Sequence, residues 1–582
     1  MAGAERVVTR AATGEDAGAR GGGGAAVAAS ADPITTEVIR HGLNSAAGQM
    51  KRALVRTAFS PVIYEVLDFA VALYDERVRL LAQAPSLPIF MGRLGFCVQA
   101  AVAAVGGPEA LEPGDVLLYN DPYGTGSHPQ DAALVAPAFL DGELIGYGAI
   151  KAHWLDVGGK DPYSTDTVDL FQEGTVFPGV KLMRAGVVNK DIMRIVMANS
   201  RVPKMVAGDI NAELVGVGTG VRALASLARR YGLAEYRAAV ERIFDHGEAV
   251  VRSYFEQLPN GVYRAHGQLD NDGLSDEPVP FTLVLVVEGS ELTIDFSEVP
   301  EQRPGPINCT LPKTVATARV AIGMLAGGAD SPNEGQQRPI RVITRPGTLF
   351  HPIRPAPSFI SGWATFQALE TILEAVAHAL PGVVPAGSGG DICTLVWWGM
   401  HDGEPWADGA PHPIGQGAHA GGDGSNALMH ISESATRTTP AEVSETKNPW
   451  LIERLDLVQD SGGAGRQRGG LGIHVRIRAL DDMWLTTVIE RTKTPPWALA
   501  GGHVGRTNRA SLTRPDGSSR SLAKATRVRV PTGSVLDMQT GGGGGYGPPA
   551  ERPRAAVLAD LVEGYVSEAA ARADYPHAFA AP

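Results

Sequence analysis

The sequence predicts a mixed α/β (α+β) protein of several domains, with an N-terminal helix-and-sheet domain and a glycine-rich, β-rich C-terminal part. Three observations predict this fold class. A long amphipathic helical pattern begins at Asp32, apolar strand-like runs joined by tight turns follow it, and the last third alternates glycine-rich stretches with short strand candidates. The 582 residues, 44% of them hydrophobic, suffice for about two to four domains. We expect a first folded domain at 32–260 and a β-rich and C-terminal α/β region at 261–582.

The first folded element follows from capping and periodicity. Residues 1–31 are rich in alanine and glycine and show no periodicity, which predicts a disordered tail. Asp32 supplies a helix N-cap and Pro33 the first helical position. Apolar residues then recur at helical spacing and predict one long amphipathic helix: Ile34, Val38, Leu43, Ala46, Met50 and Leu54.

A β-hairpin is predicted at residues 133–154, where two apolar runs are joined by an Asp-Gly dipeptide at 141–142. This dipeptide is the strongest short-range signal for a two-residue hairpin turn. A regular ladder centred on the turn pairs His153 with Gln130 and places His153 diagonal to His128, roughly 7–8 Å apart at the backbone. Two imidazoles therefore converge at the open end of the hairpin.

The remaining elements are assigned by the period and length of their apolar runs. Strands are predicted at 68–75, 79–84 and 115–120, a second hairpin at 281–296, and helices at 314–327 and 365–380. Glycine-rich stretches at 415–426, 460–472 and 540–549 separate the short strand candidates of the last third. The run of five glycines at 541–545 is more typical of a flexible or close-packing loop than of a phosphate cradle.

Composition excludes several classes of partner. The three cysteines are too few and too scattered for a disulfide framework, which fits a reducing compartment. A net charge of −12 without a basic block gives no footprint for nucleic acid. No apolar run has the length of a signal peptide core or a membrane span, so we expect a cytoplasmic protein with no membrane contact. Small-molecule substrates and protein partners remain.

The segments 120–131 and 151–159 carry the chemistry. Their side chains His128, Asp131 and His153 offer two neutral imidazoles and one carboxylate, a set that suits a catalytic divalent ion such as zinc, manganese or iron. Asp131 would face away from His153 in a regular strand, so it joins the site only if the chain near Pro129 is still loop or carries a bulge. The alternative is that these side chains cap turns or bond the backbone.

Two further aspartates are candidates for supporting or catalytic roles. Asp121 and Asp156 suit carboxylates that accept the second ring N–H of a ligating histidine, and Asp156 also suits a general base. A turn cap is an equally good interpretation of Asp121, which precedes Pro122 directly after a strand. The sequence contains no GxxxxGK[ST] loop and no GxSxG elbow, so neither nucleotide binding nor an unaided serine nucleophile is indicated.

The chain resembles the hydantoinase B/oxoprolinase family, which includes N-methylhydantoinase B, the second half of 5-oxoprolinase and the acetone carboxylase alpha subunit. The resemblance spans the chain from Asp32 to about Tyr575. Its motifs here are DPITTEVIRHGL, LVRTAFSPVIYEVLDFAVALYD, GDVLLYNDPYGTGSHPQD, AHWLDVGGKDP, LFQEGTVFP, GPIN, ERLDLVQDSGGAGRQRGGLG and GGGGGYGPP. Where many hydantoinase-type members resemble HGGTHLPDI, this chain has GTGSHPQDAA, so Gly124 replaces a histidine and a substrate contact there is expected to change.

The resemblance implies a division of labour between two subunits. A partner related to hydantoinase A binds ATP and phosphorylates the substrate, while a subunit of the present type holds the metal; the family's His-x-x-Asp and following histidine match His128, Asp131 and His153. It implies a hetero-oligomer that opens cyclic amides such as hydantoins or 5-oxoproline. Two alternatives stay open, namely an alpha-type subunit of an ATP-dependent ketone carboxylase and a non-catalytic scaffold subunit. Length favours cyclic-amide hydrolysis, because the carboxylases are usually longer.

Overall fold

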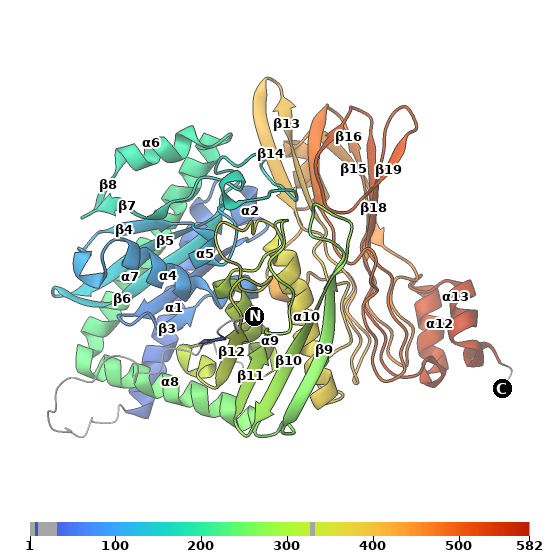
Figure 1. The fold of residues 1–582 in the computed structure, drawn as a ribbon, viewed down its shortest axis with the longest axis horizontal. Coiled ribbons are helices and arrows are strands. Elements are labelled where there is room, and N and C mark those ends of the chain that lie inside the picture. The colour runs from blue at the N-terminus through green and yellow to red at the C-terminus, as the bar shows by residue number, and fades with distance from the viewer. Residues whose placement is uncertain (1–5, 10–31, 326–331, 581–582) are drawn as a thin grey trace, which may run out of the picture.

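The computed structural model describes residues 6–9, 32–325 and 332–580, and within these residues the strands form four sheets (Figure 1). The first sheet and its helices form one side of the molecule, a second sheet lies beside them, and two further sheets lead to helices at the C-terminal end. The mixed α/β class predicted from the sequence is confirmed. No helix of the described chain combines the length and apolar character needed to cross a membrane.

The first sheet is antiparallel, with strand order β3-β2-β6-β5-β4-β7-β8. Its strands are β2 (Phe69–Asp75), β3 (Leu80–Gln83), β4 (Val116–Tyr119), β5 (Asp131–Leu140), β6 (Glu143–His153), β7 (Pro178–Arg184) and β8 (Val187–Val188). The accompanying helices are α1 (Pro33–Thr57), α2 (Pro61–Tyr64), α3 (Pro88–Met91), α4 (Leu94–Ala104), α5 (Pro122–Thr125), α6 (Lys190–Ala198), α7 (Pro203–Tyr231) and α8 (Leu233–Phe255).

Helices cover both faces of this sheet, which explains why its central strands are apolar at nearly every position. In β5, Ala132 and Leu134 face the core shared with α1 and α7, while Ala133 and Val135 face the core shared with α4. A strand buried on both faces loses the alternation of polar and apolar residues that marks a half-exposed strand. The paired strands predicted at 68–75 and 79–84, and the buried strand at 115–120, are confirmed as β2, β3 and β4.

Helix α1 is confirmed, and its cap is the one expected. The Asp32 carboxylate accepts the backbone N–H of Thr35 at 2.8 Å. Most of the predicted apolar face is buried, but Ile34 and Val38 are 75% and 46% exposed. These two residues lie on the first turns, before the helix meets α7 and the sheet, so periodicity alone overestimated the buried stripe.

The second sheet has strand order β1-β12-β11-β10-β9, and it confirms the hairpin predicted at 281–296. Its elements are β1 (Val7–Thr9), β9 (Gly261–Leu269), β10 (Val279–Glu288), β11 (Glu291–Asp295) and β12 (Ile340–Thr344), with the helices α9 (Leu311–Leu325) and α10 (Ser361–Ala379) packed on it. The predicted disordered tail, 1–31, lies outside the described residues except at 6–9. There the prediction is wrong, because Val7–Thr9 pairs with the edge strand β12.

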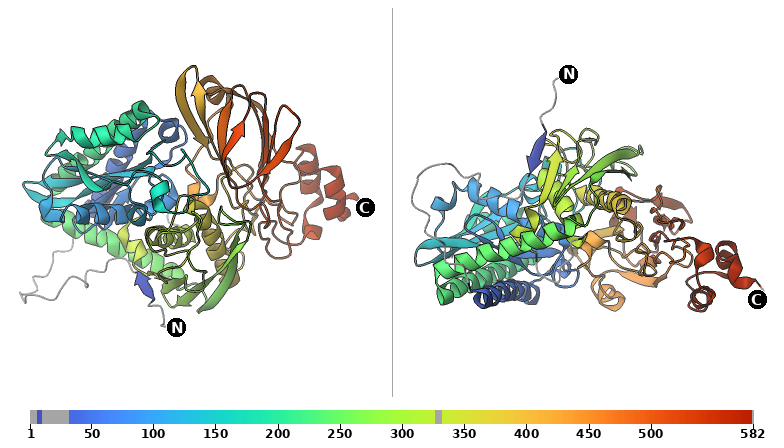
Figure 2. Two further views of the ribbon diagram at one scale, coloured as in Figure 1. Left: turned by 45° about the horizontal axis from the view of Figure 1, so that its top comes forward. Right: turned by 90° about the horizontal axis from the view of Figure 1, so that it is seen from below.

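The third and fourth sheets pack face to face around one apolar core (Figure 1). The third comprises β14 (Glu404–Ala410), β13 (Thr394–His401), β17 (Met483–Val488) and β20 (Ala525–Val530). The fourth comprises β15 (Trp450–Leu457), β16 (Ile473–Ala479), β21 (Val535–Gln539), β18 (Arg509–Thr513) and β19 (Ser519–Leu522). Helix α11 (Ala441–Lys447) precedes β15, and α12 (Arg554–Val562) and α13 (Glu568–Asp574) lie at the end farthest from the first sheet (Figures 1 and 2).

The glycine-rich stretches of the last third form a bundle of closely packed extended segments, which we call the glycine bundle: residues 387–390, 415–417, 462–472 and 541–545. Backbone hydrogen bonds join neighbouring segments; Gly543 donates to Gly470 at 2.9 Å and Gly544 to Gly387 at 2.8 Å. A Cβ added to Gly543 would lie 1.9 Å from the Gln416 carbonyl oxygen. The bundle therefore requires glycine because its backbones lie too close together for any side chain.

Candidate metal centre

The loop between β4 and β5 brings His128 to the end of the first sheet. Asp121 caps the short helix α5, and Gly126 ends it with a left-handed φ of +69°. The Asn120 side chain then fixes the returning chain by donating to the Pro129 carbonyl at 2.7 Å and to the Thr175 carbonyl at 2.9 Å. His128 is thus held in the loop that immediately precedes β5.

The hairpin β5–β6 forms as predicted, but its register differs by one residue from the expected one. His153 lies opposite Asp131, not opposite Gln130, because the pairing shifts between Ala138 and Phe139. The shift leaves Ile145 unpaired as a β-bulge near the turn. The bulge is what turns Asp131 toward His153, a condition that the sequence raised but placed near Pro129.

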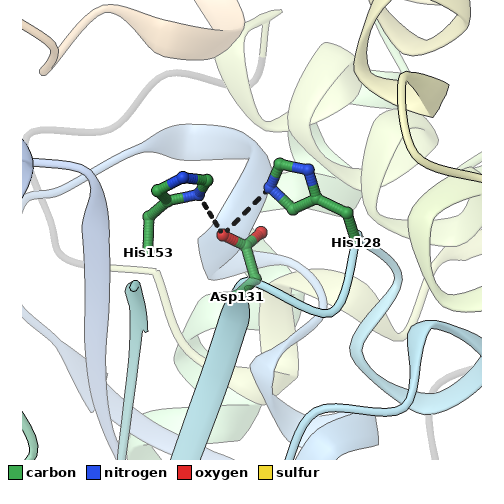
Figure 3. Close-up of side chains that lie close together, drawn as sticks. All are labelled: His128, Asp131 and His153. Carbon is green, nitrogen blue, oxygen red and sulfur yellow. Dashed lines mark hydrogen bonds and ion pairs between the residues drawn. The ribbon is translucent and has the colours of Figure 1, made fainter. Parts of the chain in front are cut away.

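The three predicted ligands converge (Figure 3). His128 Nε2 and His153 Nδ1 lie 3.4 and 3.2 Å from the same carboxylate oxygen, Asp131 Oδ1. One ligand atom from each residue lies within 4.8 Å of the other two. Asp131 is fully buried, while the two histidine side chains are 10% and 13% exposed. The set is compact enough for a single ion and is open on its histidine side.

Cations from the sheet and the neighbouring helix compensate the buried carboxylate. Lys151 Nζ lies 3.3 Å and the Arg93 guanidinium 3.7 Å from Asp131 Oδ2, and Ser127 donates a hydrogen bond to the same oxygen. Burial alone would raise the pKa of Asp131, but the charges of Lys151 and His128 hold it well below its usual value. Asp131 is therefore ionised, with Oδ2 engaged by the protein and Oδ1 directed at the histidines.

The two imidazoles differ in their electrostatics. Burial lowers the pKa of His128 to about 4, so its ring is neutral at physiological pH, and its Nδ1 is buried without a hydrogen-bond partner in the described structure. For His153 burial also lowers the pKa, but the hydrogen bond to Asp131 and the charge of Asp68 outweigh it and raise the pKa overall. A neutral imidazole with a free lone pair is the form that binds a metal ion.

Asp68 is a site residue that sequence reasoning missed. Its backbone carbonyl accepts the His153 N–H at 3.1 Å at the start of β2, and its buried Oδ1 has no hydrogen-bond partner among the described residues. Burial raises its pKa to about 6, although His153 acts in the opposite direction. The available signal was an acidic residue at the start of an otherwise apolar strand in a sheet whose central strands are buried on both faces.

A small cavity of about 100 Å³ adjoins the histidines. Asp68, His128 and His153 form one wall, and residues 407–411 of β14 and the following turn form the opposite wall. Glu433 also lines this cavity, and burial together with the charge of Asp68 raises its pKa to about 8. The rest of the lining is mostly apolar, so the cavity suits a small uncharged ring beside a polar cluster.

Aromatic side chains fix the cavity wall next to His128. The His128 ring meets Phe359 and Tyr163 edge-on, with centroid separations of 5.1 and 5.7 Å. The main chain of Phe359 is held by Glu173, whose Oε1 accepts its N–H at 2.8 Å. Trp363 continues this wall, 6.4 Å from Tyr163.

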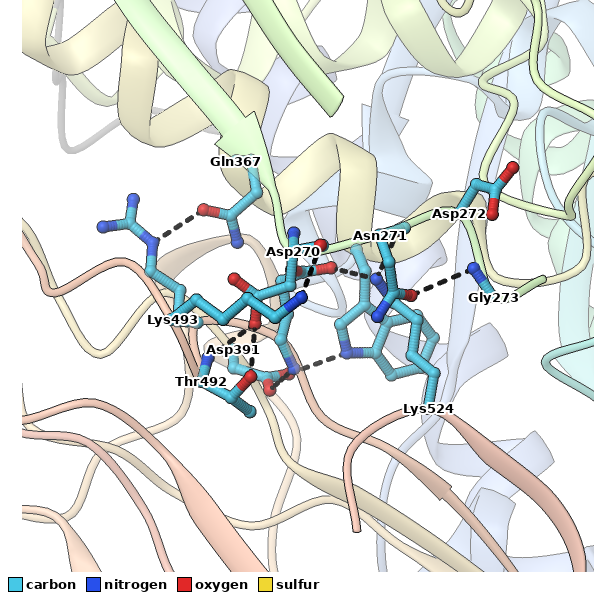
Figure 4. Close-up of polar contacts among 12 residues, drawn as sticks. Asp270, Asn271, Asp272, Gly273, Gln367, Asp391, Thr492, Lys493 and Lys524 are labelled. Carbon is cyan, nitrogen blue, oxygen red and sulfur yellow. Dashed lines mark hydrogen bonds and ion pairs between the residues drawn. The ribbon is translucent and has the colours of Figure 1, made fainter. Parts of the chain in front are cut away.

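A buried polar network anchors that wall to the C-terminal sheets (Figure 4). The Trp363 indole donates to Asp391 at 2.7 Å, and Asp391 in turn accepts the Glu490 N–H at 2.6 Å. Glu490 pairs with Lys524 at 2.5 Å, with both side chains 1% exposed. The network joins the second sheet to the third, so both sides of the cavity belong to one connected structure.

Asp121 and Asp156 are positioned by turns and not by the histidines. Asp121 accepts the Tyr123 N–H at 3.0 Å and pairs with Arg354 at 2.6 Å. Asp156 accepts the Gly158 N–H at 3.2 Å and pairs with Arg201 at 2.5 Å. Within the described residues neither carboxylate is hydrogen-bonded to His128 or His153, so the structure does not place them in the carboxylate–histidine contacts expected from the sequence.

Comparisons with known proteins agree with this geometry. The family model for hydantoinase B/oxoprolinase matches residues 32–549. A protein named as the B component of a D-/L-hydantoinase, from Pseudomonas sp. strain NS671, is 30% identical, covering 94% of this chain and 95% of its own. The caprolactamase beta chain of Pseudomonas jessenii is also 30% identical, covering 94% and 96% of the two chains.

Two solved structures share the fold. The ATP-dependent caprolactamase of Pseudomonas jessenii superposes with a TM-score of 0.88 at 28% identity, covering 94% of this chain and 96% of that one. Nucleotide-free acetone carboxylase superposes with a TM-score of 0.85 at 18% identity, covering 94% of this chain and 79% of that one. With the family model matched across nearly the whole folded chain, this protein belongs to the hydantoinase B/oxoprolinase family.

Proposed function

We propose that this chain is the metal-binding subunit of an ATP-dependent cyclic-amide hydrolase of the cytoplasm. The observation that carries the proposal is the convergence of His128, Asp131 and His153 on one edge of a small, mostly apolar cavity. In this proposal a second subunit, similar to hydantoinase A, binds ATP, and the two chains form a hetero-oligomer. The names of the hydantoinase and caprolactamase relatives, each given as one component of a larger enzyme, support such a partner.

The donor set fits a divalent ion such as zinc, manganese or iron. The ligands are His128, Asp131 and His153, and Asp68 adds a second carboxylate whose Oδ1 is buried without a partner among the described residues. When bound, the ion supplies Lewis-acid chemistry, polarising a substrate carbonyl or lowering the pKa of a water molecule. Lys151 and Arg93 hold the Asp131 carboxylate in its binding orientation.

Opening a lactam or hydantoin requires amide resonance to be broken, which explains the demand for ATP. Phosphorylation at the partner converts the carbonyl oxygen into part of a leaving group, and water completes the opening. The ring nitrogen must then gain a proton. Glu433 lines the cavity with a pKa of about 8, so it is protonated at neutral pH and suits this donation. We assign proton transfer to Glu433 and not to Asp156, which holds the loop after His153 through Arg201.

Ketone carboxylation is the second candidate, and the lengths of the matching chains favour hydrolysis. This chain covers 96% of the caprolactamase chain but 79% of the acetone carboxylase chain. A scaffold role predicts a closed metal site or none, whereas the three candidate ligands adjoin a cavity.

The first experiment is elemental analysis of the purified chain after loading with zinc, manganese or iron. Near-stoichiometric metal is expected in the wild type and in His41→Ala, a control at an exposed histidine whose side chain is 71% accessible. His128→Ala and His153→Ala should lose the metal while remaining folded. A wild type that takes up none of the three ions would contradict the metal role and favour the scaffold.

The second experiment measures reactions in the presence of a co-expressed ATP-binding partner. ATP consumption coupled to the opening of caprolactam, hydantoin or 5-oxoproline is expected, and Glu433→Gln should slow it without loss of metal. ATP consumption with acetone and bicarbonate, but with none of the ring compounds, would instead identify a carboxylase.

A further inference from the structure

A second cavity, of about 650 Å³, lies between the first sheet and the second, and the reaction proposed above does not use it. It is bounded by Tyr74 of β2, Phe96 of α4, the C-terminal half of α9 and the turn 334–337. Its size is in the range of sites for small organic ligands. No described residue lines both this cavity and the one at the metal centre, since the turn around 431–434 separates them.

The lining of this second cavity contains two charged residues, Arg319 and Glu334, and the remainder is apolar or uncharged. The Arg319 guanidinium lies over the Phe96 ring, 5.7 Å from its centroid, and makes no ion pair or hydrogen bond within the described chain. Glu334 Oε2 accepts the Leu80 N–H at 3.1 Å, and the Glu334 carboxylate is likewise without an ion-pair partner among the described residues. One positive and one negative group therefore face the same cavity without forming an ion pair.

Uncharged acceptors in the same cavity also lack donors. Gln83 Oε1 and Gln337 Oε1 are buried and have no hydrogen-bond partner in the described structure. Buried polar atoms are normally paired, so unpaired acceptors and unpaired charges in one cavity indicate a ligand that supplies the missing groups. Around them lie Val251, Ile322 and Met324, which suit an aliphatic body.

We propose that this cavity binds an amino acid zwitterion with an aliphatic body, its carboxylate on Arg319 and its ammonium group on Glu334 and the neighbouring glutamine oxygens. A guanidinium pairs with a carboxylate through two parallel hydrogen bonds, and an ammonium group carries three donors for the acceptor side. Hydrolysis of a lactam yields a compound of this class. Its identification as the product of this protein rests on the proposed function, whereas the binding itself does not.

The test is calorimetric titration of the full-length chain with 6-aminohexanoate, carried out in a His128→Ala/His153→Ala background so that the metal centre contributes nothing. Saturable binding is expected, with hexanoate and hexylamine at least tenfold weaker because each lacks one charged group. Arg319→Gln and Glu334→Gln should each weaken binding of 6-aminohexanoate by at least tenfold. Arg319→Lys should retain part of the affinity, and Arg194→Gln, a change at an exposed arginine, should bind like its parent.

Two results would overturn the proposal: no saturable binding of 6-aminohexanoate, or equal affinity in Arg319→Gln and its parent. Thermal unfolding of each variant identifies one that fails to fold, and the remaining variants still decide the outcome. Because binding is measured without metal and without ATP, it can succeed while every lactamase assay fails, and the reverse is equally distinguishable.

Discussion

The hairpin β5–β6 and the glycine bundle solve opposite packing problems. In the hairpin, the backbone ladder places particular side chains, so that a one-residue bulge decides whether Asp131 meets His153. In the glycine bundle the backbones approach so closely that side chains are excluded, as the 1.9 Å approach at Gly543 shows. The comparison teaches that conformationally simple sequence is not flexible structure, and that function depends here on the region whose side chains vary.

The largest expected effect is on the glycine bundle. Gly543→Ala forces a Cβ against the Gln416 carbonyl, and because both partners are backbone the clash cannot be relieved by a rotamer change. We expect the free energy of unfolding to fall by more than about 4 kcal/mol. Gly323→Ala is the matched control, since its Cβ meets nothing within 4 Å on helix α9, and it should stabilise by about 0.5–1 kcal/mol. Denaturant unfolding compares the two, and similar stabilities would refute close packing.

Asp131→Asn tests whether the hairpin also carries a structural charge. The change leaves Lys151 and Arg93 buried without their shared anion, so stability should fall by about 3 kcal/mol and metal uptake should be lost. Adding Lys151→Met removes one stranded charge and should restore part of the stability, while metal uptake stays absent. A double variant no more stable than Asp131→Asn would show that the carboxylate serves the metal alone.

Asp68→Asn separates the side chain found in the structure from those expected in the sequence. Metal affinity should fall about tenfold, because the second carboxylate near His153 is lost while the three principal ligands remain. Asp156→Asn is the matched change at an aspartate held by Arg201, and it should leave metal affinity unchanged. Titration with a competing chelator gives both affinities, and the opposite ranking would restore Asp156 to the site.

The smallest effect concerns the wall beside His128 and depends on pH. Burial raises the pKa of Glu173 to about 8 from 4.5, so the folded protein keeps a proton that the unfolded chain releases. The stability this proton contributes is fully present below pH 4.5 and is lost as the pH rises toward 8. Glu173→Gln keeps the acceptor for Ser358 and Phe359, and it should lessen the fall in stability between pH 5 and pH 8 by about 1–2 kcal/mol. Parallel pH dependences of the two proteins would contradict the raised pKa.

The sequence by itself determined the elements whose signals are local. The Asp32 cap, the Asp-Gly turn at 141–142 and the apolar runs of β2–β4 each depend on neighbouring residues, and the structure has all of them. The metal candidates His128 and His153 also follow, because a hairpin turn fixes which residues lie at its open end. The domain division at residue 260 stays a prediction.

Tertiary structure alone decided the rest, for a physical reason in each case. The bulge at Ile145 depends on how the hairpin twists against its neighbours, and no local signal gives its position. Asp68 and Glu433 reach the cavity from segments far apart in the chain, brought together by burial of separate apolar faces. Glycine-rich sequence fits both a loose loop and a close-packed bundle, and only the contacts between distant segments distinguish them.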